Sequence, residues 1–286
     1  MFLPRKILEG KLRNMLAEDI GQGDITTALV IPADSTAEAE VTAKELGVLA
    51  GMEEAKILLE DLGLKVEDSV SDGEKVKAKN ILMKISGDTR TILSVERTLL
   101  NIISRMSGIA TTTRRVIDKI HKAKLRTKVA CTRKVAPGLL YFDKKAVLIG
   151  GGDTHRLHLD DMILVKDNHI AVVGSLEKAV KTVRKNVSFS KKIEVEVTEV
   201  KDVLAAAKAG ADIIMLDNFS TKQIEKAVKL LRDENLYGKV LLEASGGINE
   251  ENILAYASTG VDIVSLGEIT DSTRVLDISL EITGIH

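Results

Sequence analysis

The feature that most constrains the fold is a regular alternation of short apolar segments with amphipathic segments between residues 128 and 267. The apolar, β-branched segments predict six strands, at 128–132, 162–166, 193–197, 212–217, 239–245 and 262–267. The amphipathic segments predict helices at 175–187, 199–210, 221–234 and 249–260. Because apolar strands that alternate with helices form a parallel sheet with helices on its outer face, the pattern predicts an incomplete (β/α) barrel. An open, doubly wound sheet is the alternative.

The N-terminal part of the chain has a different pattern. Strand-like stretches at 36–51 and 76–87 flank a helical segment at 53–63, and DG and GD pairs mark turns. A second helical pattern, at 93–105, links the two parts. The fold class is therefore predicted as α/β, with an N-terminal α+β domain before the barrel.

Length and charge limit the domain count and the partners. A chain of 286 residues is long enough for two domains, and we place them at residues 1–110 and 111–286, with the last residues packing back on the first domain. Forty-one Lys and Arg residues against 42 Asp and Glu residues give no overall basic field, so neither nucleic acid nor a membrane surface is expected as a partner. The single cysteine, Cys131, and the lack of a secretory pattern or a long apolar run predict a cytoplasmic protein.

Polar residues follow nearly every predicted strand. In a barrel the active site is built from the C-terminal ends of the strands, so these residues are candidates for one site. They are Thr132, Arg133, Lys134, Lys166, Glu196, Asp217, Ser245, Gly246, Gly247 and Gly267. The early strands supply cations and the middle strands supply Glu196 and Asp217, which predicts a polyanionic substrate that travels with a divalent metal. The SGG and LGE segments favour a phosphate at the late strands.

The segment GGGDTHRLHLDDMILVKDNH, residues 150–169, allows two interpretations. His155, His158 and His169 are candidates for a zinc site. However, Arg156 and Lys166 lie among them, and two cations beside a divalent metal are unfavourable unless an anion neutralises them. An anion site that contains Arg156, Lys166 and a donor from His155 is therefore preferred, with His158 and His169 in packing or capping roles.

Several longer motifs point to one family. They are EDIGQGDITT, ERTLLNIISRMSGIATTT, TRKVAPGL, GGGDTHRLHLDDMILVKDNH, EVEV, IIMLDN, LEASGGI and GVDIVSLGEIT, and they cover nearly the whole chain. In this order they closely resemble the quinolinate phosphoribosyltransferases, also called nicotinate-nucleotide pyrophosphorylases (carboxylating). The resemblance implies transfer of phosphoribose from phosphoribosyl pyrophosphate (PRPP) to quinolinate, with decarboxylation to nicotinate mononucleotide in de novo NAD biosynthesis.

The resemblance also implies an assembly and residue roles. Family members are homodimers with shared active sites, and some form hexamers as trimers of dimers. Arg97 would enter the partner's site, where Arg133, His155, Arg156 and Lys166 complete the quinolinate pocket. Lys134, Lys166, Glu196 and Asp217 would be catalytic, and Glu196 and Asp217 would hold Mg²⁺ with PRPP, directly or through water. The remaining substrate-binding residues would be Thr132, Ser245, Gly246, Gly247, Leu266, Gly267 and Glu268.

Some positions depart from the family pattern. Cys131, Leu140 and Asp271 stand where other members often have Asp, Arg and His, and the last two changes remove possible phosphate donors. Two rival functions remain open. One is a related phosphoribosyltransferase of the molybdenum-transport accessory type that acts on another aromatic acid. The other is a non-catalytic anion-binding barrel, which would gain nothing from Glu196 and Asp217 facing its ligand.

Overall fold

The computed structural model describes residues 3–286, which form two compact units. The first unit contains the chain up to Arg114 together with residues 138–151 and 273–286, and the second contains residues 115–137 and 152–272. The chain passes between the units after residues 114, 137, 151 and 272.

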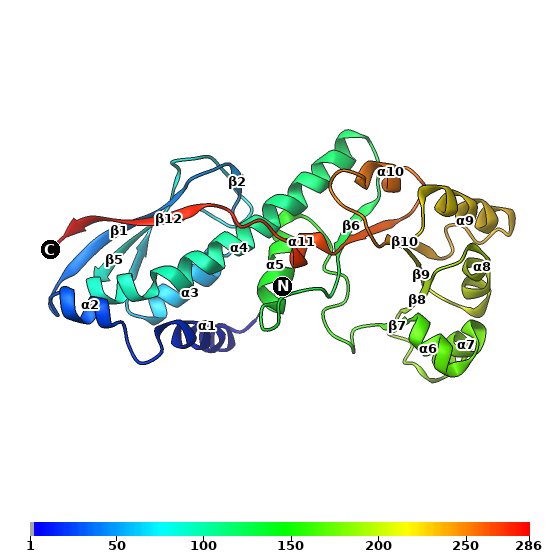
Figure 1. The fold of residues 1–286 in the computed structure, drawn as a ribbon, viewed down its shortest axis with the longest axis horizontal. Helices are drawn as coiled ribbons and strands as arrows, with labels where there is room; N and C mark the ends of the chain where they lie inside the picture. The colour runs from blue at the N-terminus through cyan, green and yellow to red at the C-terminus, as the bar shows by residue number, and fades with distance from the viewer. Residues whose placement is uncertain (1–2) are drawn as a thin grey trace. The chain divides into compact units, whose positions relative to one another are not determined.

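The first unit is built on an antiparallel sheet whose strand order is β12-β1-β5-β3 (Figure 1). The strands are β1 (Thr36–Ala43), β3 (Lys65–Glu67), β5 (Ile81–Asp88) and β12 (Ile278–Ile285), and β2 (Gly47–Val48) pairs separately with β4 (Lys75–Val76). In β1 the odd-numbered residues Ala37, Ala39, Val41 and Ala43 are buried, whereas the residues between them are at least partly exposed. This period of two shows that one face of the sheet packs on the core.

Helices α1 (Arg5–Ile20), α2 (Ile25–Val30), α3 (Met52–Asp61) and α5 (Leu140–Gly150) also belong to the first unit. The helix expected at 93–105 is part of α4 (Thr89–Lys122), which is 34 residues long and continues past Gly108. A Cβ atom at Gly108 would lie 2.1 Å from the carbonyl oxygen of Arg274. Glycine is required there because the C-terminal segment crosses the helix, so it does not end α4 as its low helix propensity would suggest.

The EDIGQGDITT motif spans the turn between α1 and α2, and it is hydrogen-bonded to α4. Asp24 caps α2 by accepting a 2.9 Å hydrogen bond from the backbone N–H of Thr27, and it also accepts one from Ser94 Oγ at 3.1 Å. Asp19 accepts a hydrogen bond from Thr98 Oγ1 at 2.9 Å. The motif therefore fixes this turn against the helix that carries Arg97.

The second unit has a parallel sheet of six strands in the order β6-β11-β10-β9-β8-β7 (Figure 1). They are β6 (Lys128–Cys131), β7 (Ile163–Val165), β8 (Ile193–Val197), β9 (Ile213–Asp217), β10 (Leu241–Ser245) and β11 (Ile263–Leu266), each within a segment predicted as a strand. Since β6 and β7 stay at the two edges and do not pair with each other, the barrel is incomplete, as predicted.

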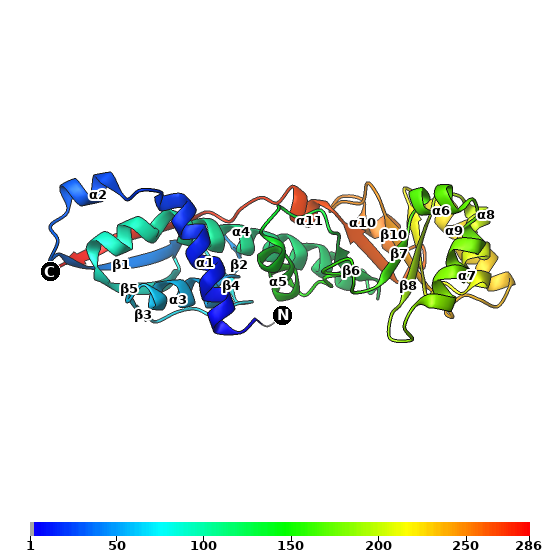
Figure 2. The ribbon, with the colours of Figure 1, turned by 90° about the horizontal axis from the view of Figure 1, so that it is seen from below.

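The helices of the second unit are α6 (Asp167–Val173), α7 (Leu176–Asn186), α8 (Val200–Ala209), α9 (Thr221–Asp233), α10 (Ile253–Ala257) and α11 (Glu268–Asp271). Helices α7, α8 and α9 lie along one side of the sheet in both ribbon views (Figures 1 and 2). The helix predicted at 249–260 is shorter than expected. Asn249 and Asn252 use their side chains in local turns, where Asn252 Oδ1 accepts from the Asn249 N–H at 2.9 Å, so the helix begins only at Ile253.

The cores of both units consist mainly of Ile, Leu, Val and Ala. In β9, for example, Ile213 to Leu216 are all buried, which fits a strand covered on both faces. Within residues 3–286, every helix is too short or too polar to cross a membrane.

Candidate active site

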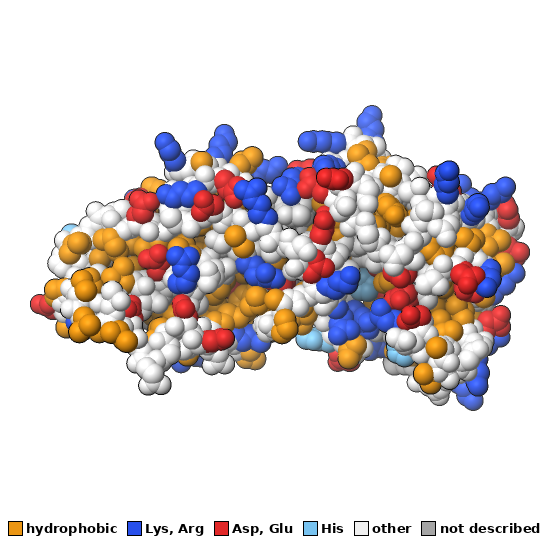
Figure 3. All heavy atoms as spheres, in the orientation of Figure 1, with side chains coloured by type: hydrophobic (Ala, Val, Ile, Leu, Met, Phe, Trp, Pro, Cys, Tyr) orange, Lys and Arg blue, Asp and Glu red, His pale blue; other side chains and the backbone are white. Residues whose placement is uncertain are grey.

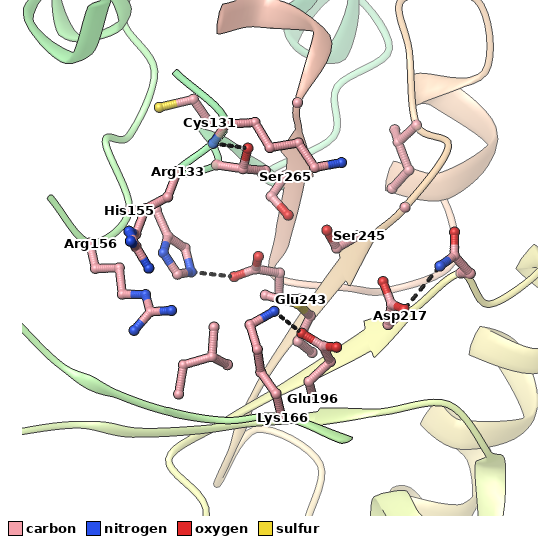
Figure 4. Close-up of a pocket in the computed structure, with 18 of the residues that line it drawn as sticks. Cys131, Arg133, His155, Arg156, Lys166, Glu196, Asp217, Glu243, Ser245 and Ser265 are labelled. Carbon is pink, nitrogen blue, oxygen red and sulfur yellow. Dashed lines mark hydrogen bonds and ion pairs between the residues drawn. The ribbon is translucent and has the colours of Figure 1, made fainter. Parts of the chain in front are cut away.

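A cavity of about 500 Å³ lies at the C-terminal ends of the strands of the second unit (Figure 4). Twelve residues expected at the site line it: Thr132, Arg133, Lys134, His155, Arg156, Lys166, Glu196, Asp217, Ser245, Gly246, Gly247 and Gly267. They come from six strand ends and from the loop before β7. On the face shown in Figure 3, Lys, Arg and His side chains gather beside acidic side chains on this unit.

Three cations of the cavity have no carboxylate partner. Arg133 and Lys134 are exposed, whereas Arg156 is only 8% exposed. Within residues 3–286, no carboxylate oxygen lies within 4.0 Å of any of the three. Burial and the neighbouring Arg133 both lower the pKa of Arg156. A buried guanidinium without a counter-ion is costly, so this part of the cavity favours an anionic ligand.

The other end of the cavity carries two carboxylates. Lys166 follows β7 and its Nζ donates to Glu196 Oε2 at 2.6 Å, so that the two side chains point toward each other in Figure 4. Asp217 ends β9, and its Oδ2 accepts a hydrogen bond from Asn218 Nδ2 at 2.9 Å. The cavity therefore has unpaired cations at one end and two carboxylates at the other, but Lys166, which was expected with the cations, pairs with Glu196.

The glycines at the late strands allow the backbone to come close to other groups. Gly246 has φ +93° and Gly247 has φ +62°, and a Cβ atom at Gly246 would lie 2.3 Å from Asn218 Oδ1. At Gly267 a Cβ atom would lie 3.3 Å from Lys134 Cδ, so the Lys134 side chain passes over this glycine. Backbone groups near an ammonium suit the binding of a phosphate.

His155 lies on the inner side of the cavity, above two acids that sequence analysis did not identify. Its Nε2 is 3.2 Å from Glu194 Oε2 and 3.2 Å from Glu243 Oε2, and both glutamates are fully buried. Burial lowers the pKa of His155, but the hydrogen bonds to Glu194 and Glu243 outweigh this effect and raise the pKa to about 10. The two acids therefore favour the cationic form of the imidazole.

Three of the predicted site residues do not line this cavity. The side chain of Leu266 is fully buried, and Glu268 Oε1 accepts a 2.9 Å hydrogen bond from the backbone N–H of Glu250. Arg97 belongs to the first unit, where its side chain is 64% exposed, and it lines a second cavity there together with Arg105 and Arg274.

The cavity also contains lining residues that were not predicted: Cys131, Leu164, Met215, Asn218, Glu243, Ile248 and Ser265. Several of them precede a predicted site residue by two positions, for example Glu243 before Ser245 and Met215 before Asp217. Because side chains two apart in a strand share a face, that spacing was the signal that identifies them.

The histidine cluster considered for zinc does not form. His158 is exposed, and His169 Nδ1 accepts a 2.9 Å hydrogen bond from the Lys166 N–H at the start of α6, which confirms a capping role. Two groups of three possible ligands occur in the described part of the chain, namely His155 with Glu194 and Glu243, and Glu53 with Glu54 and Asp72. Neither group contains His158 or His169.

The positions that depart from the family pattern have different surroundings. Cys131 is buried and its Sγ lies 3.6 Å from the carbonyl oxygen of Thr154. Leu140 begins α5 in the first unit and is not among the residues that line the cavity. Asp271 lies beside Gly267, where a Cβ atom would be 2.8 Å from its Oδ2. Of the three, Asp271 adds a negative charge next to the candidate phosphate site.

Comparisons with known proteins match the whole chain. A model described as quinolinate phosphoribosyl transferase, N-terminal domain, matches residues 24–107, and the corresponding C-terminal domain model matches residues 109–281. A probable nicotinate-nucleotide pyrophosphorylase [carboxylating] of Methanothermobacter thermautotrophicus is 44% identical over 274 residues, which cover 96% of this chain and 98% of that protein.

More distant relatives agree with this match. A quinolinate phosphoribosyltransferase [decarboxylating] of Nicotiana tabacum is 39% identical over 300 residues, which cover 98% of this chain and 83% of that protein. The solved structure of the nicotinate-nucleotide pyrophosphorylase from Francisella tularensis aligns with a TM-score of 0.89 and 39% identity, over 99% of this chain and 98% of that one.

Proposed function

We propose that this chain, which belongs to the quinolinate phosphoribosyl transferase family, transfers phosphoribose from PRPP to quinolinate and releases pyrophosphate and CO₂. The product would be nicotinate mononucleotide, an intermediate of de novo NAD biosynthesis. The names of the relatives support this reaction, since they describe a phosphoribosyltransferase and a decarboxylating enzyme.

One observation of the site carries the proposal. The buried Arg156 has no carboxylate partner and lies among other cations, yet Glu196 and Asp217 line the same cavity. Two adjacent carboxylates on quinolinate would neutralise the cations through charge-assisted, bidentate contacts. A simple binder of polyanions would have no use for the acids, whereas a ribosyl transfer needs them.

The binding groups would position the two substrates for displacement. Arg133, His155 and Arg156 fix the dicarboxylate so that the ring nitrogen faces the anomeric carbon of PRPP, which makes the bimolecular step effectively unimolecular. The nitrogen lone pair forms the new N–C bond as the bond from C1 to pyrophosphate breaks. Positive charge that develops on the ribose is stabilised by the carboxylates of Glu196 and Asp217, and Lys134 binds the departing phosphate oxygens.

Decarboxylation follows from the charge on the ring. Once the nitrogen is a pyridinium, the bond from C2 to its carboxylate can break, because the electron pair left on C2 lies next to the cationic nitrogen. CO₂ leaves and C2 takes up one proton. We propose Lys166 as the donor, since its ammonium lines the cavity and is held by Glu196 at 2.6 Å.

We further propose that Mg²⁺ accompanies PRPP. The side chains of Glu196 and Asp217 offer the oxygen ligands that Mg²⁺ prefers, and only one oxygen of each has a partner in the hydrogen bonds described above. When bound, the ion would neutralise charge on the pyrophosphate.

We also propose a cytoplasmic homodimer, or a hexamer made of three such dimers, in which Arg97 of each subunit reaches the cavity of its partner. The support is the position of Arg97, which is exposed on α4 beside the turn held by Asp19 and Asp24. Among the described residues its only ion-pair contact is with the adjacent Glu96 at 3.9 Å, so the guanidinium can contact a ligand carboxylate.

The reaction is tested by incubating the protein with PRPP, Mg²⁺ and carboxyl-labelled quinolinate. We expect CO₂ and pyrophosphate in equal amounts, and no turnover of nicotinate, because nicotinate lacks the 2-carboxylate that the cations bind. Turnover of nicotinate or another aromatic acid in preference to quinolinate would favour the accessory-type enzyme. Binding of PRPP without release of either product would favour the non-catalytic barrel.

A further inference from the structure

The floor of the cavity contains two charges that the proposed reaction does not use. Glu194 precedes Glu196 by two residues in β8, and Glu243 precedes Ser245 by two residues in β10, so each lies on the cavity face one layer deeper. Both are fully buried. The residues paired with them in the neighbouring strands are uncharged: Leu164 and Ile213 beside Glu194, and Met215 and Ile263 beside Glu243. The two carboxylates therefore have no cation of their own layer to pair with.

The cation comes from the loop before β7. His155 has a left-handed backbone, with φ 52°, and its N–H donates to Asp153 Oδ1 at 2.8 Å. This turn directs the imidazole inward, and Figure 4 shows the ring pointing at Glu243. Nε2 lies 3.2 Å from one oxygen of each glutamate, although the two strands are separated by β9. The ring nitrogen is therefore hydrogen-bonded to Glu243, and Glu194 lies within ion-pair distance of the same atom.

This arrangement favours charge on the ring. Burial and the neighbouring Glu243 raise the pKa of Glu194, and contact with a cationic His155 opposes that rise. Both carboxylate oxygens of Glu194 and Oε1 of Glu243 are buried without hydrogen-bond partners in the described part of the chain. A neutral imidazole would offer one N–H and no charge to two buried carboxylates, which is unfavourable. The other charged groups around the ring are Arg156, the next residue, and Asp153, whose carboxylate binds the backbone. An imidazolium supplies both a donor and a positive charge.

The protonation state of the ring decides what His155 can bind. In a neutral imidazole whose Nε2 donates to the acids, Nδ1 is an acceptor and repels a carboxylate ligand. In an imidazolium, Nδ1 is a second donor on the side of the ring away from the acids. We propose that Glu194 and Glu243 are positioning residues that hold His155 as an imidazolium, so that its Nδ1–H is a fixed donor to one carboxylate of quinolinate.

The identity of the ligand in this inference rests on the proposed function. The protonation state of His155 does not. The closing experiment is therefore in two parts. The first uses ¹⁵N-histidine-labelled protein without substrate, with the signal of His155 identified by its loss in His155→Gln among the five histidines. We expect wild-type His155 to stay doubly protonated from pH 6 to pH 9, and Glu243→Gln to lower its titration midpoint by about one unit or more.

The second part measures quinolinate binding and steady-state kinetics. In Glu243→Gln we expect the KM for quinolinate to rise about tenfold at one pH unit above the lowered midpoint, and to return toward the wild-type value at one unit below it, where the ring is protonated again. The KM for PRPP should change little. If the role of Glu243 were purely structural, its replacement would weaken the binding of both quinolinate and PRPP at every pH. Recovery of the KM for quinolinate at low pH therefore distinguishes a positioning role from a structural one.

Glu54→Gln is the matched control, because Glu54 is also fully buried but belongs to the first unit. It should leave the titration of His155 unchanged. The inference is overturned if wild-type His155 is neutral at pH 7.5, or if Glu243→Gln leaves the titration and the KM unchanged. If His155 is an imidazolium as expected but the wild type neither binds nor converts quinolinate, the proposed function fails instead.

Discussion

Both units contain buried charged side chains, but the partners of these side chains differ between the two units. In the first unit Arg105 makes two 2.8 Å hydrogen bonds to Asp143, and Lys145 Nζ donates to Glu54 at 2.7 Å. In the second unit Arg156 is buried without a carboxylate partner. Paired charges complete the fold by themselves, whereas an unpaired charge needs a ligand. The difference sets Arg156, which has no carboxylate partner, apart from Arg105 and Lys145, whose ion pairs stabilise the first unit.

The largest expected effect is a loss of activity when Arg156, the buried cation without a carboxylate partner, is replaced. Arg156→Ala should lower kcat/KM for quinolinate by about a thousandfold, because about 4 kcal/mol of charge-assisted contact to a substrate carboxylate is lost. The melting temperature should stay near that of the wild type, since no ion pair of the protein is broken. Steady-state kinetics and calorimetry check both points. Arg232→Ala, on α9 over the ring of Tyr237, is the control and should retain activity. Near-normal activity of Arg156→Ala would count against the whole pocket assignment.

Removal of a charge that has a buried partner should instead lower the stability of the protein. Arg105→Ala leaves the fully buried Asp143 without its counter-ion and should destabilise the protein by about 3 kcal/mol. Urea denaturation measures this change in the free energy of unfolding. Arg115→Ala, which removes an exposed pair with Glu250, should cost less than about 1 kcal/mol. If the two variants were equally stable, the buried pair would contribute no more to stability than the exposed one.

A smaller effect is expected in a test of the proposed role of Arg97 in the site of a partner subunit. Arg97→Ala and Lys166→Ala should each be inactive as homodimers. After subunit exchange, an equal mixture should recover about a quarter of wild-type activity, because half of the dimers are hybrids and each hybrid has one intact site. Mass spectrometry of the native dimers confirms the exchange. Exchange without recovered activity would argue against a shared site.

The smallest effect concerns pH. The folded-state pKa of His155 is raised to about 10, so the group stays protonated below that value. Its contribution to stability is complete below its unfolded pKa of about 6.5 and is lost as the pH rises through about 10. Quinolinate affinity should therefore change by less than about twofold between pH 7 and pH 9 from this group. Calorimetric titration across that range checks it, and a steep loss between pH 6 and pH 7 would contradict it.

The strands and most of the cavity residues could be predicted from the sequence, because both depend on local patterns. Period and β-branching identified the six parallel strands, and the residue after each strand identified the cavity. Glu194 was missed although it stands in IEVEV with Glu196 on the same face. A buried acid among valines carries no local sign of its partner, and His155 is 39 residues away in the sequence.

Other features depend on contacts between distant segments. The length of α4 could not be predicted from the sequence, because a glycine such as Gly108 usually indicates the end of a helix. Only the structure shows that the backbone of Arg274 packs against Gly108. For the same reason the EDIGQGDITT motif had no role beyond turn chemistry until Asp19 and Asp24 were found bound to Thr98 and Ser94. Neither partner can be identified from spacing alone.

The return of β12 to the first sheet has a practical consequence. Residues 278–285 supply the outer neighbour of β1, although they come at the far end of the chain. A fragment that ends after residue 110 would expose β1 as a bare edge, with a row of free N–H and C=O groups ready to pair with other molecules. Anyone who expresses the N-terminal half for crystallisation or antibody work should therefore fuse this last strand back through a short linker, or expect aggregates.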